Sequence, residues 1–599
     1  MKTSFTKTSR IFFISIFSLF TASLLTAQDL DNPGWLSSKP LTPEEITAKF
    51  AAIDPNSSSS RGVEPRVQAS ALNAAAQTIQ TPLPLELTAS IVTPTPTAGG
   101  NEADTITPEI ALLARGLNYD ALKIYEYVYN YIEFEPYYGS KKGAQLTLLE
   151  KSGNDFDQSS LLVALLRASG LNPNYKSGAC TFTYEDISSW MGLSLTPFSY
   201  LTTGTGSGSF TARFGVPDTV NNRRFFALFS FFDIAGYHYI DPFLTSSGSL
   251  QLSIPHVWVE VNVGGTVRTL SPSFKYHSEF SGLNLATATG YSKTQILADA
   301  AGTVSSSPDS ATSLNYTNLS SRLSTYSQNL KTDLADNHPG LDVNFVAGSR
   351  DIIRYTFPSF AAVDSISGLF PWPECPWLSI TPWAVIPDVE MSKIQIKCGT
   401  YNYTTKSFTS VSFDQTIKMP ALKGGKLSLT WAGNTAVIRL NEGLLGSTFT
   451  IAGANVDIQL NATHNHYDKA DVNGAYVNSN LGKSNQSETK PYLKGDAYAY
   501  AIVYAFDNPD QVLRNRQEIL DGYRRSGLTE SDWRVRTEIL NIMGLQWFSQ
   551  VSKSENVIGP LFSCLPFHHH RFGRVAQEQS YYIDVGLQYA LNETQDSDS

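Results

Sequence analysis

Two stretches of the chain hold residue types from which an active site could be built. The first, 153–170, opens with a glycine turn and then places two carboxylates, Asp155 and Asp157, at the start of a predicted helix. The second alternates valines with His256 and Trp258, which predicts a strand with the imidazole and the indole on one face. A carboxylate and an imidazole are groups that general acid–base chemistry uses. Both stretches are therefore candidate parts of a catalytic or binding site.

The elements that position these groups follow from local patterns. The first stretch predicts a loop, a buried helix with one apolar stripe, and the start of a strand. Gly170 follows the helix, as expected for a glycine that ends it. In the second stretch, a strand through His256 ends at Gly264-Gly265, a two-residue hairpin turn, and a return strand runs to Leu270. The stripe consists of Leu161, Leu162, Leu165 and Leu166.

Together these motifs resemble the transglutaminase-like superfamily, which shares its core with papain-type cysteine enzymes. In that family a Gly-x-Cys precedes a helix ending in Leu-Leu-Arg-Ala-x-Gly, and residues 165–170 match that ending. A His-x-Trp-x-Glu strand follows, which residues 256–260 match, and then a Leu-Asp-Pro, which 270–272 match except at the centre. The resemblance implies an α+β fold with a papain-like core.

In the family's register the cysteine position falls on Asp155, the histidine on His256 and the aspartate on Ser271. Family chemistry needs a thiolate at a helix N-terminus, a histidine that moves the proton, and an aspartate that orients it. A carboxylate is a far weaker acyl nucleophile than a thiolate. Ser271 can hydrogen-bond the histidine but carries no charge. The resemblance therefore implies a catalytically degenerate triad.

Two interpretations of these positions remain open. Asp155 and His256 either retain general acid–base chemistry or form a structural ion pair or hydrogen bond that preserves the cleft. Trp258, on the face of His256, either lines a substrate-binding cleft or fills the core. Cys180, near the expected strand, is either a core residue or a substitute nucleophile.

Histidines elsewhere suggest two further sites. His464 and His466 share a strand face, and with Asp468 they have a spacing that could hold a metal, but no third ligand is assured. A solvated loop is the alternative. Residues 568–570 are three consecutive histidines, which diverge on a strand and favour partner contact or packing over chelation. We expect no metal and no cofactor, since P-loop, GxGxxG, GxSxG and HExxH motifs are absent from the sequence.

The composition excludes several classes of protein. Hydrophobic residues make up 42% of the 599-residue chain, which indicates globular cores and more than one domain. Four cysteines are too few for a disulfide scaffold, although a bridge between Cys375 and Cys398 is possible. Removing the three basic residues of 1–27 takes the net charge from −10 to −13, which argues against nucleic acid and anionic lipid as partners.

Residues 1–27 are typical of a signal peptide, with Lys2, Lys7 and Arg10 before an apolar run and a small-residue cleavage site ending at Ala27. A membrane anchor is the alternative, but the apolar run is short and contains several serines. We therefore expect a secreted, periplasmic or cell-surface protein with no membrane span after cleavage.

The pattern along the chain predicts seven segments. Thr317–Leu334, Asn508–Arg525 and Thr529–Ser549 are the clearest later helices, with Asn508 expected as a cap. Alternation over 390–465 predicts strands of a sandwich-like domain. The segments are a signal peptide (1–27), an N-terminal segment with a Ser/Thr/Pro-rich linker (28–105), a transglutaminase-like domain (106–280), a helical or irregular connector (281–385), a β-rich domain (386–470), a C-terminal helical region (471–590) and a disordered tail (591–599).

Three functional hypotheses follow. The first is a degenerate module that binds a peptide or protein, or belongs to a larger surface or secreted assembly. The second is an active acyl-transfer or amide-hydrolase enzyme that uses His256 with an unconventional partner. The third, a carbohydrate-contacting surface protein, rests only on the β-rich segment and the abundant aromatic residues. A nucleophile within hydrogen-bond reach of His256 would favour the second over the first.

Overall fold

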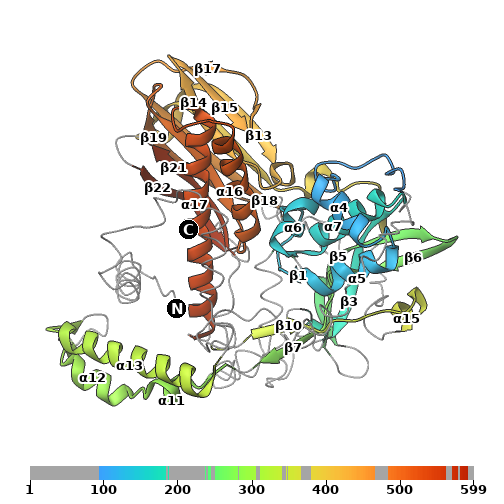
Figure 1. Cartoon of the computed structure of the whole chain (residues 1–599), viewed down its shortest axis with the longest axis horizontal. Coiled ribbons are helices and arrows are strands. Elements are labelled where there is room, and N and C mark those ends of the chain that lie inside the picture. The colour runs from blue at the N-terminus through green and yellow to red at the C-terminus, as the bar shows by residue number, and fades with distance from the viewer. Residues whose placement is uncertain are drawn as a thin grey trace, which may run out of the picture. The chain divides into compact units, whose positions relative to one another are not determined.

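In the computed structural model, whose helices and strands are labelled in Figure 1, the chain forms two compact units. One unit spans Ser281–Ala347, and the other spans Glu86–Phe280 and Gly348 onward. The described residues are 93–183, 186–187, 190, 236–237, 240–244, 250–280, 282–304, 311–339, 346, 349–365, 380–465, 483–561, 569–577 and 581–590. Helices and antiparallel sheets both contribute, so the predicted α+β class is confirmed.

Four helices form the first part of the larger unit, and the sequence explains where each begins. Thr107 and Pro108 start the first, Asp120 caps the second through the amides of Leu122 and Lys123, and Asn154 caps the fourth. The cap of the fourth helix is thus Asn154, and the two carboxylates that follow lie inside its first turn. The helices are α4 (Pro108–Gly116), α5 (Ala121–Tyr131), α6 (Gly143–Glu150) and α7 (Asp155–Ala168).

A five-stranded sheet packs against α7. Its strand order is β11-β3-β5-β4, and β6 pairs with β5 on the same edge as β4, further along the strand. Gly264 and Gly265, with φ of +59° and +87°, form the predicted turn between β5 and β6. The strands are β3 (Asn174–Thr183), β4 (Ile240–Leu244), β5 (Leu250–Val263), β6 (Thr266–Leu270) and β11 (Thr381–Trp383), and β1 (Glu133–Phe134) pairs separately with β2 (Ser152–Gly153).

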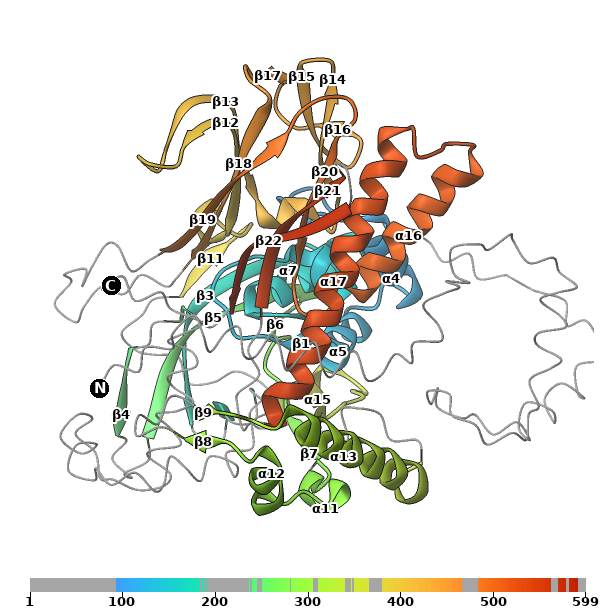
Figure 2. The same ribbon diagram turned by 90° about the vertical axis from the view of Figure 1, so that its left-hand side faces the viewer.

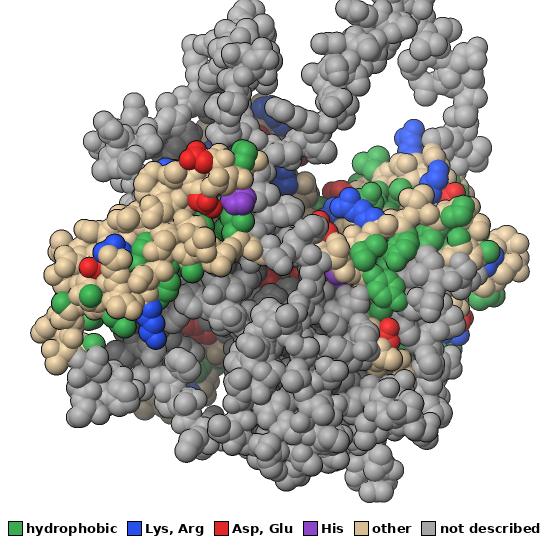
Figure 3. Space-filling view, turned by 90° about the horizontal axis from the view of Figure 1, so that it is seen from below, with side chains coloured by type: hydrophobic (Ala, Val, Ile, Leu, Met, Phe, Trp, Pro, Cys, Tyr) green, Lys and Arg blue, Asp and Glu red, His purple; other side chains and the backbone are tan. Residues whose placement is uncertain are grey.

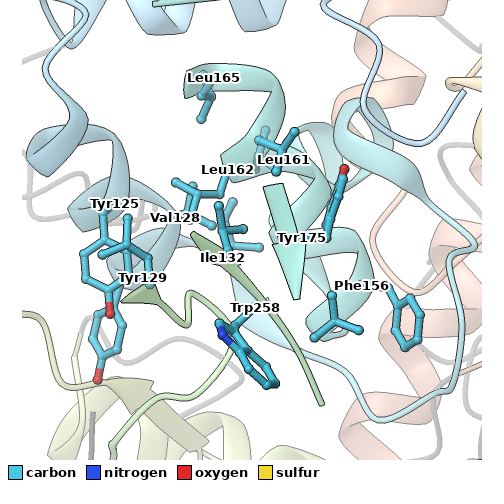
Figure 4. Packing of buried hydrophobic residues seen from close by; sticks show 14 of the residues in the cluster. Tyr125, Val128, Tyr129, Ile132, Phe156, Leu161, Leu162, Leu165, Tyr175 and Trp258 are labelled. Atoms are coloured by element: carbon cyan, nitrogen blue, oxygen red, sulfur yellow. The ribbon is translucent and has the colours of Figure 1, made fainter. Parts of the chain in front are cut away.

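The first hydrophobic core lies between α5, α7 and this sheet. Figure 4 shows Leu162 of α7 near Val128 of α5 and near Ile132, the residue after that helix, with Tyr175 and Trp258 of the sheet in the same cluster. Every one of the fourteen residues of α7 is buried, so burial extends around the whole helix and is not limited to the predicted leucine stripe. Because α7 is packed on all sides, its first turn, which begins with Asp155, is held in one place within the core.

The segment predicted as a connector, 281–385, is divided in two. β7 (His277–Phe280) pairs with β10 (Ser349–Ile352), and the residues that lie between these two strands in the sequence form a separate unit, called here the looped-out unit. The chain then returns to the first core through Tyr355, Phe357, α15 (Phe360–Ser365) and β11. Sequence periodicity did not show this return, because it depends on pairing between distant strands.

The looped-out unit consists of α11 (Leu285–Thr289), α12 (Lys293–Ala300), the β8–β9 pair (Thr303–Val304 and Ala311–Thr312) and α13 (Tyr316–Asn337). The predicted helix at 317–334 is present as α13. Tyr326 of α13 is buried and its ring lies 5.9 Å from that of Tyr291. Figure 3 shows the described surface of this unit as mostly uncharged, in keeping with the serines, threonines and asparagines of α13.

Two sheets form the β-rich part of the larger unit (Figure 2). The first has the order β13-β12-β18-β19, and the second has the order β16-β15-β14-β20-β21-β22 with β17 beside β15. The strands are β12 (Lys393–Asn402), β13 (Ser407–Lys418), β14 (Leu427–Ala432), β15 (Thr435–Leu440), β16 (Gly443–Leu444), β17 (Phe449–Thr450), β18 (Asn455–Asn465), β19 (Lys483–Leu493), β20 (Ala499–Ala505), β21 (His569–Gln577) and β22 (Tyr581–Ala590), with short 3-10 turns η2 (Asp388–Glu390) and η3 (Met419–Leu422).

The β-rich part therefore extends well beyond the predicted boundary at 470. Four of its strands lie in the region expected to be helical, 471–590, which also contains α16 (Asp510–Arg525) and α17 (Trp533–Leu561). Figures 1 and 2 show these two helices side by side, and α17 packs on β20 and β21. Pro509 precedes α16, whereas Asn508 donates its side-chain amide to the carbonyl of Glu150, so Asn508 does not cap the helix.

A glycine permits the close packing of α17 on the sheet. A Cβ added at Gly544 would lie 2.7 Å from Cγ2 of Val503 and 2.9 Å from Cγ2 of Val575. Such distances are shorter than carbon–carbon contact allows. Gly544 thus sets how near the helix approaches β20 and β21.

The two parts of the larger unit share core residues. Tyr137 and Leu146, from the helical part, pack in the hydrophobic core of the β-rich part. Between them, Ser140 exchanges backbone hydrogen bonds with the 390–392 segment. The loop at 137–143 is therefore joined to both parts.

The last residues of the predicted linker, 93–105, pack against the domain that follows. The amide of Thr97 donates to the carbonyl of Arg167, and Asp104 forms a buried ion pair with Arg167 at 2.6 Å. Residues 93–105 are therefore held against the C-terminal end of α7. The rest of the predicted linker, the signal peptide and the 591–599 tail lie outside the described residues. Among the helices that are described, none is both long and apolar enough to cross a membrane.

Candidate active site

The first turn of α7 meets the middle of β5 and the end of β6. Asp155 is the first residue of α7, and His256 lies on the β5 segment that packs against this helix. The β5–β6 hairpin pairs Val259 with Leu270, which returns Ser271 alongside His256. The three positions taken from the family's register are thereby brought together across more than one hundred residues of chain.

The three side chains lie in line, with the histidine between the other two. Oδ2 of Asp155 is 3.5 Å from Nδ1 of His256, and Nε2 of His256 is 2.9 Å from Oγ of Ser271. The second distance is that of a hydrogen bond, whereas the first is longer than an ordinary one. Each imidazole nitrogen therefore faces a different polar neighbour.

Two donors hold the carboxylate of Asp155. The hydroxyl of Tyr237 donates to Oδ1, and the backbone amide of Val257 donates to Oδ2 at 2.8 Å. Burial, and then the adjacent Asp155 carboxylate, raise the pKa of Tyr237 well above its ordinary value, so its hydroxyl keeps the proton that it donates. Asp155 thus acts as an acceptor at both of its oxygens.

The bond to Val257 fills a gap along one edge of β5. On that edge β4 pairs as far as Ser253, and β6 begins to pair only at Val259. Between them Val257 donates its amide to Asp155 and accepts at its carbonyl from the hydroxyl of Ser159, at 3.2 Å. Among the described residues, no strand pairs with these backbone groups on this edge, and side chains of α7 satisfy them, as buried backbone groups require.

Aromatic rings enclose the histidine. The ring of Trp190 lies 5.4 Å away edge-on, Phe182 lies 6.2 Å away edge-on, and Trp258 lies 6.0 Å away in a stacked arrangement. Asp155 is 0% exposed, and His256 and Ser271 are each 1% exposed. Trp258, predicted to line a substrate cleft or fill the core, is 2% exposed and packs in the core.

One comparison with known proteins covers the part of this site that α7 contributes. Residues 105–201, which include α4 to α7 and β3, match the model of the transglutaminase-like superfamily. The chain contains a transglutaminase-like domain. No curated protein and no solved structure gives a significant match. The resemblance drawn from the helix motif is thus confirmed, while His256 and Ser271 lie beyond the matched residues.

Asp157 is a second buried carboxylate of the transglutaminase-like domain, and sequence analysis gave it only a helix-end role. It accepts the hydroxyls of Tyr137 and Ser140, both at 2.6 Å. It also accepts the backbone amides of Lys141, Lys142 and Gly143, at 2.9 to 3.1 Å. Asp157 therefore joins the start of α7 to the start of α6. No periodic signal marks such a residue, because its donors come from an irregular loop.

Two adjacent lysines lie buried in the same loop. The ammonium group of Lys142 contacts Glu135 at 2.6 Å and Glu150 at 2.9 Å, and these carboxylates outweigh burial and raise its pKa. Burial raises the pKa of Glu150 to about 7 despite Lys142. Burial also lowers the pKa of Lys141 to about 7, although Asp157 opposes this change. Glu150 lines a small cavity with Tyr504 and residues of α17.

The other predicted sites receive no support from the described residues. His464 is buried near the end of β18, while His466, Asp468 and His568 lie outside the described residues. His569 and His570 begin β21. Across the described part of the chain, no group of three His, Cys, Asp or Glu side chains could hold a metal ion.

The cysteines contribute no nucleophile to the described site. Cys180 lies on β3 and is fully buried in the first core, which agrees with its interpretation as a core residue. Cys398 is a buried thiol on β12, and burial raises its pKa well above the ordinary value. Cys375, its possible bridge partner, and Cys564 lie outside the described residues.

Proposed function

We propose that the chain is an exported protein whose transglutaminase-like domain has lost the thiol chemistry of its family and serves as a binding module. Its partner would be a peptide or a protein, or the remainder of a surface or secreted assembly. One observation carries this proposal. The nucleophile position holds Asp155, which is 0% exposed and accepts hydrogen bonds at both oxygens.

The side chain at position 155, a carboxylate, supports the loss of thiol catalysis. A carboxylate attacks acyl carbon far more weakly than a thiolate. The oxygens of Asp155 are also committed to Tyr237 and Val257, so an attack would require both bonds to break. The same bonds make Asp155 part of the packing between α7 and β5. The position has thus exchanged a reactive role for a structural one.

Export is supported by the basic and then apolar residues 1–27. The net charge of −13 after their removal supports a partner other than nucleic acid or anionic lipid. The abundance of uncharged polar residues on α13 supports a protein that works outside the cell. A fusion of residues 1–27 to a reporter that is active only after export tests this part of the proposal. Retention of the reporter in the cytoplasm would refute it.

Transfer of a primary amine to a glutamine peptide tests the loss of thiol chemistry. The purified chain without residues 1–27 should show no turnover above the buffer control. Asp155→Cys restores the thiol, and any activity that it gains should disappear in the double variant Asp155→Cys/His256→Ala. Turnover by the native chain that depends on His256 would overturn the proposal.

A second candidate function is favoured by a different observation. Nε2 of His256 lies 2.9 Å from Oγ of Ser271, which is the separation of a base from a hydroxyl that it can activate. This arrangement supports an acyl-transfer or amide-hydrolase activity that uses His256 with an unconventional partner. Hydrolysis of an acyl ester or amide that is abolished by His256→Ala would select this candidate.

A further inference from the structure

The order of groups around His256 is the reverse of the order that thiol chemistry needs. In the family's register the nucleophile is at the start of α7 and the orienting carboxylate is at the end of β6. Here the carboxylate, Asp155, is at the start of α7 and a hydroxyl, Ser271, is at the end of β6. In space, the imidazole therefore lies between a hydroxyl and a carboxylate, which is the combination of a serine nucleophile with its base and orienting acid.

We infer that Ser271 is the nucleophile of a serine-type relay in which His256 is the general base and Asp155 is its positioning residue, and that this relay takes small acyl esters. The inference rests on the second function proposed above and names its nucleophile and its substrate class. Oγ of Ser271 lies 2.9 Å from Nε2 of His256, and Nδ1 of His256 lies 3.5 Å from Oδ2 of Asp155.

The roles of the two imidazole nitrogens follow from their neighbours. A base must accept the proton of Ser271 at Nε2, so the neutral ring carries its proton on Nδ1. Nδ1 faces the carboxylate of Asp155, which favours that tautomer and stabilises the imidazolium that forms. Tyr237 and Val257 fix Asp155 from the other side. The carboxylate therefore cannot turn away from the ring without losing two hydrogen bonds.

The reaction balances with water as the only co-reactant. Oγ of Ser271 attacks the ester carbonyl carbon while Nε2 of His256 takes the hydroxyl proton. The bond from carbon to the alcohol oxygen breaks, and the leaving alkoxide takes the proton from Nε2. Water then attacks the acyl-serine, gives a proton to Nε2, and the Ser271 oxygen leaves and recovers that proton. The products are one carboxylic acid and one alcohol.

The enclosure of the site sets the size of the substrate. Trp190, Phe182 and Trp258 surround the imidazole, and Ser271 is 1% exposed. A long peptide or a bulky acyl group does not fit among these rings. A short acyl group enters through local opening of the packing, which makes turnover slow. The relay thus fits acetyl-sized esters better than it fits proteins.

Covalent labelling of the full mature chain tests the inference. Methanesulfonyl fluoride, an acetyl-sized reagent for activated serines, should sulfonylate Ser271 within the tryptic peptide 269–275 and release fluoride. Fragmentation of this peptide separates Ser271 from Ser273, a neighbouring serine that is also buried and makes no hydrogen bond through its hydroxyl to any described residue. Ser271→Ala should abolish labelling, whereas the matched control Ser273→Ala should leave it unchanged.

The base and the positioning residue have separate readouts. His256→Gln should slow labelling at least about 100-fold, the usual size of a general-base contribution. Asp155→Asn should lower the kcat for a small ester about 10-fold or more while its KM stays within about twofold, because the imidazolium that forms in the transition state loses its facing negative charge.

Three results would overturn the inference: no adduct on the native chain, an adduct on Ser273, or labelling that His256→Gln does not change. Labelling of Ser271 without transfer of an amine to a glutamine peptide would support the relay and leave the proposed loss of thiol chemistry intact. Amine transfer by the native chain without any Ser271 adduct would instead refute that loss and the relay together. The two proposals therefore fail in distinguishable ways.

Discussion

Removing the carboxylate of Asp155 should destabilise the whole fold, because Asp155 joins α7 to β5. Asp155→Ala leaves the hydroxyl of Tyr237 and the amide of Val257 without their acceptor in a fully buried place. An orphaned buried donor costs about 1–3 kcal/mol. Two such donors predict a loss of roughly 2–6 kcal/mol in the free energy of unfolding.

Smaller changes at the same position should rank in a defined order. In Asp155→Asn the side-chain oxygen can still accept from Val257, and the hydroxyl of Tyr237 can rotate to accept from the new amide. We therefore expect a loss of only about 1–2 kcal/mol. Asp155→Cys offers a weak acceptor, so its loss should fall between those of the other two variants. Restoring the family's thiol would thus cost stability in this chain.

Equilibrium unfolding in urea measures this ranking through the midpoint and the slope. The double variant Asp155→Ala/Tyr237→Phe gives the sharper test, because Tyr237→Phe removes the donor that Asp155→Ala orphans. The combined loss should be smaller than the sum of the two single losses by about 1 kcal/mol or more. Equal midpoints for Asp155→Ala and the native chain, or strictly additive losses, would refute the structural role assigned to Asp155.

Three further predictions concern other parts of the larger unit. Gly544→Ala should lower stability by about 1–3 kcal/mol through a clash with Val503, whereas Gly522→Ala in α16, where the added Cβ meets nothing within 4 Å, should raise it by about 0.5–1 kcal/mol; thermal melting compares the two. Asp157→Asn should lower the free energy of unfolding in urea by roughly 2–5 kcal/mol, more than Asp155→Asn. Five donors bond the two oxygens of Asp157, and the new NH2 group cannot accept from the donors that faced the oxygen it replaces. Burial raises the pKa of Glu150 to about 7, so the folded chain holds the proton of this carboxyl more tightly than the unfolded chain does. The stability that the bound proton contributes is fully present below the unfolded pKa of about 4.5 and is lost as pH rises through 7. Glu150→Gln should remove that loss, so the variant should gain up to about 3 kcal/mol on the native chain between pH 4.5 and pH 8, and identical pH profiles would contradict this.

Local patterns were sufficient for the elements around the site. The leucine stripe and Gly170 placed α7, the two glycines at 264–265 placed the β5–β6 turn, and the motif register paired Asp155 with His256. Each of these signals lies within a few residues of sequence. They were informative because helix ends and tight turns depend on the local backbone.

Contacts between distant segments were not predictable in the same way. The return of 349–383 to the first core and the extension of the β-rich part to 590 depend on strand pairing between distant segments. The roles of Tyr237 and Val257 depend on which side chain fills a gap in a sheet edge. One sequence contains no signal for such a gap, because it appears only when β4 and β6 leave it open.

Position 155 combines a structural role at the edge of β5 with a place beside His256. The edge of β5 needs an acceptor opposite the amide of Val257, and the first turn of α7 is the element that reaches it. A carboxylate at position 155 meets that need better than a thiol, and the helix N-terminus favours its negative charge. Once Asp155 is fixed there it also faces Nδ1 of His256 and leaves Nε2 to Ser271. The proposed relay therefore uses as its orienting group the same carboxylate that accepts from the edge of β5, with Ser271 on the opposite side of His256.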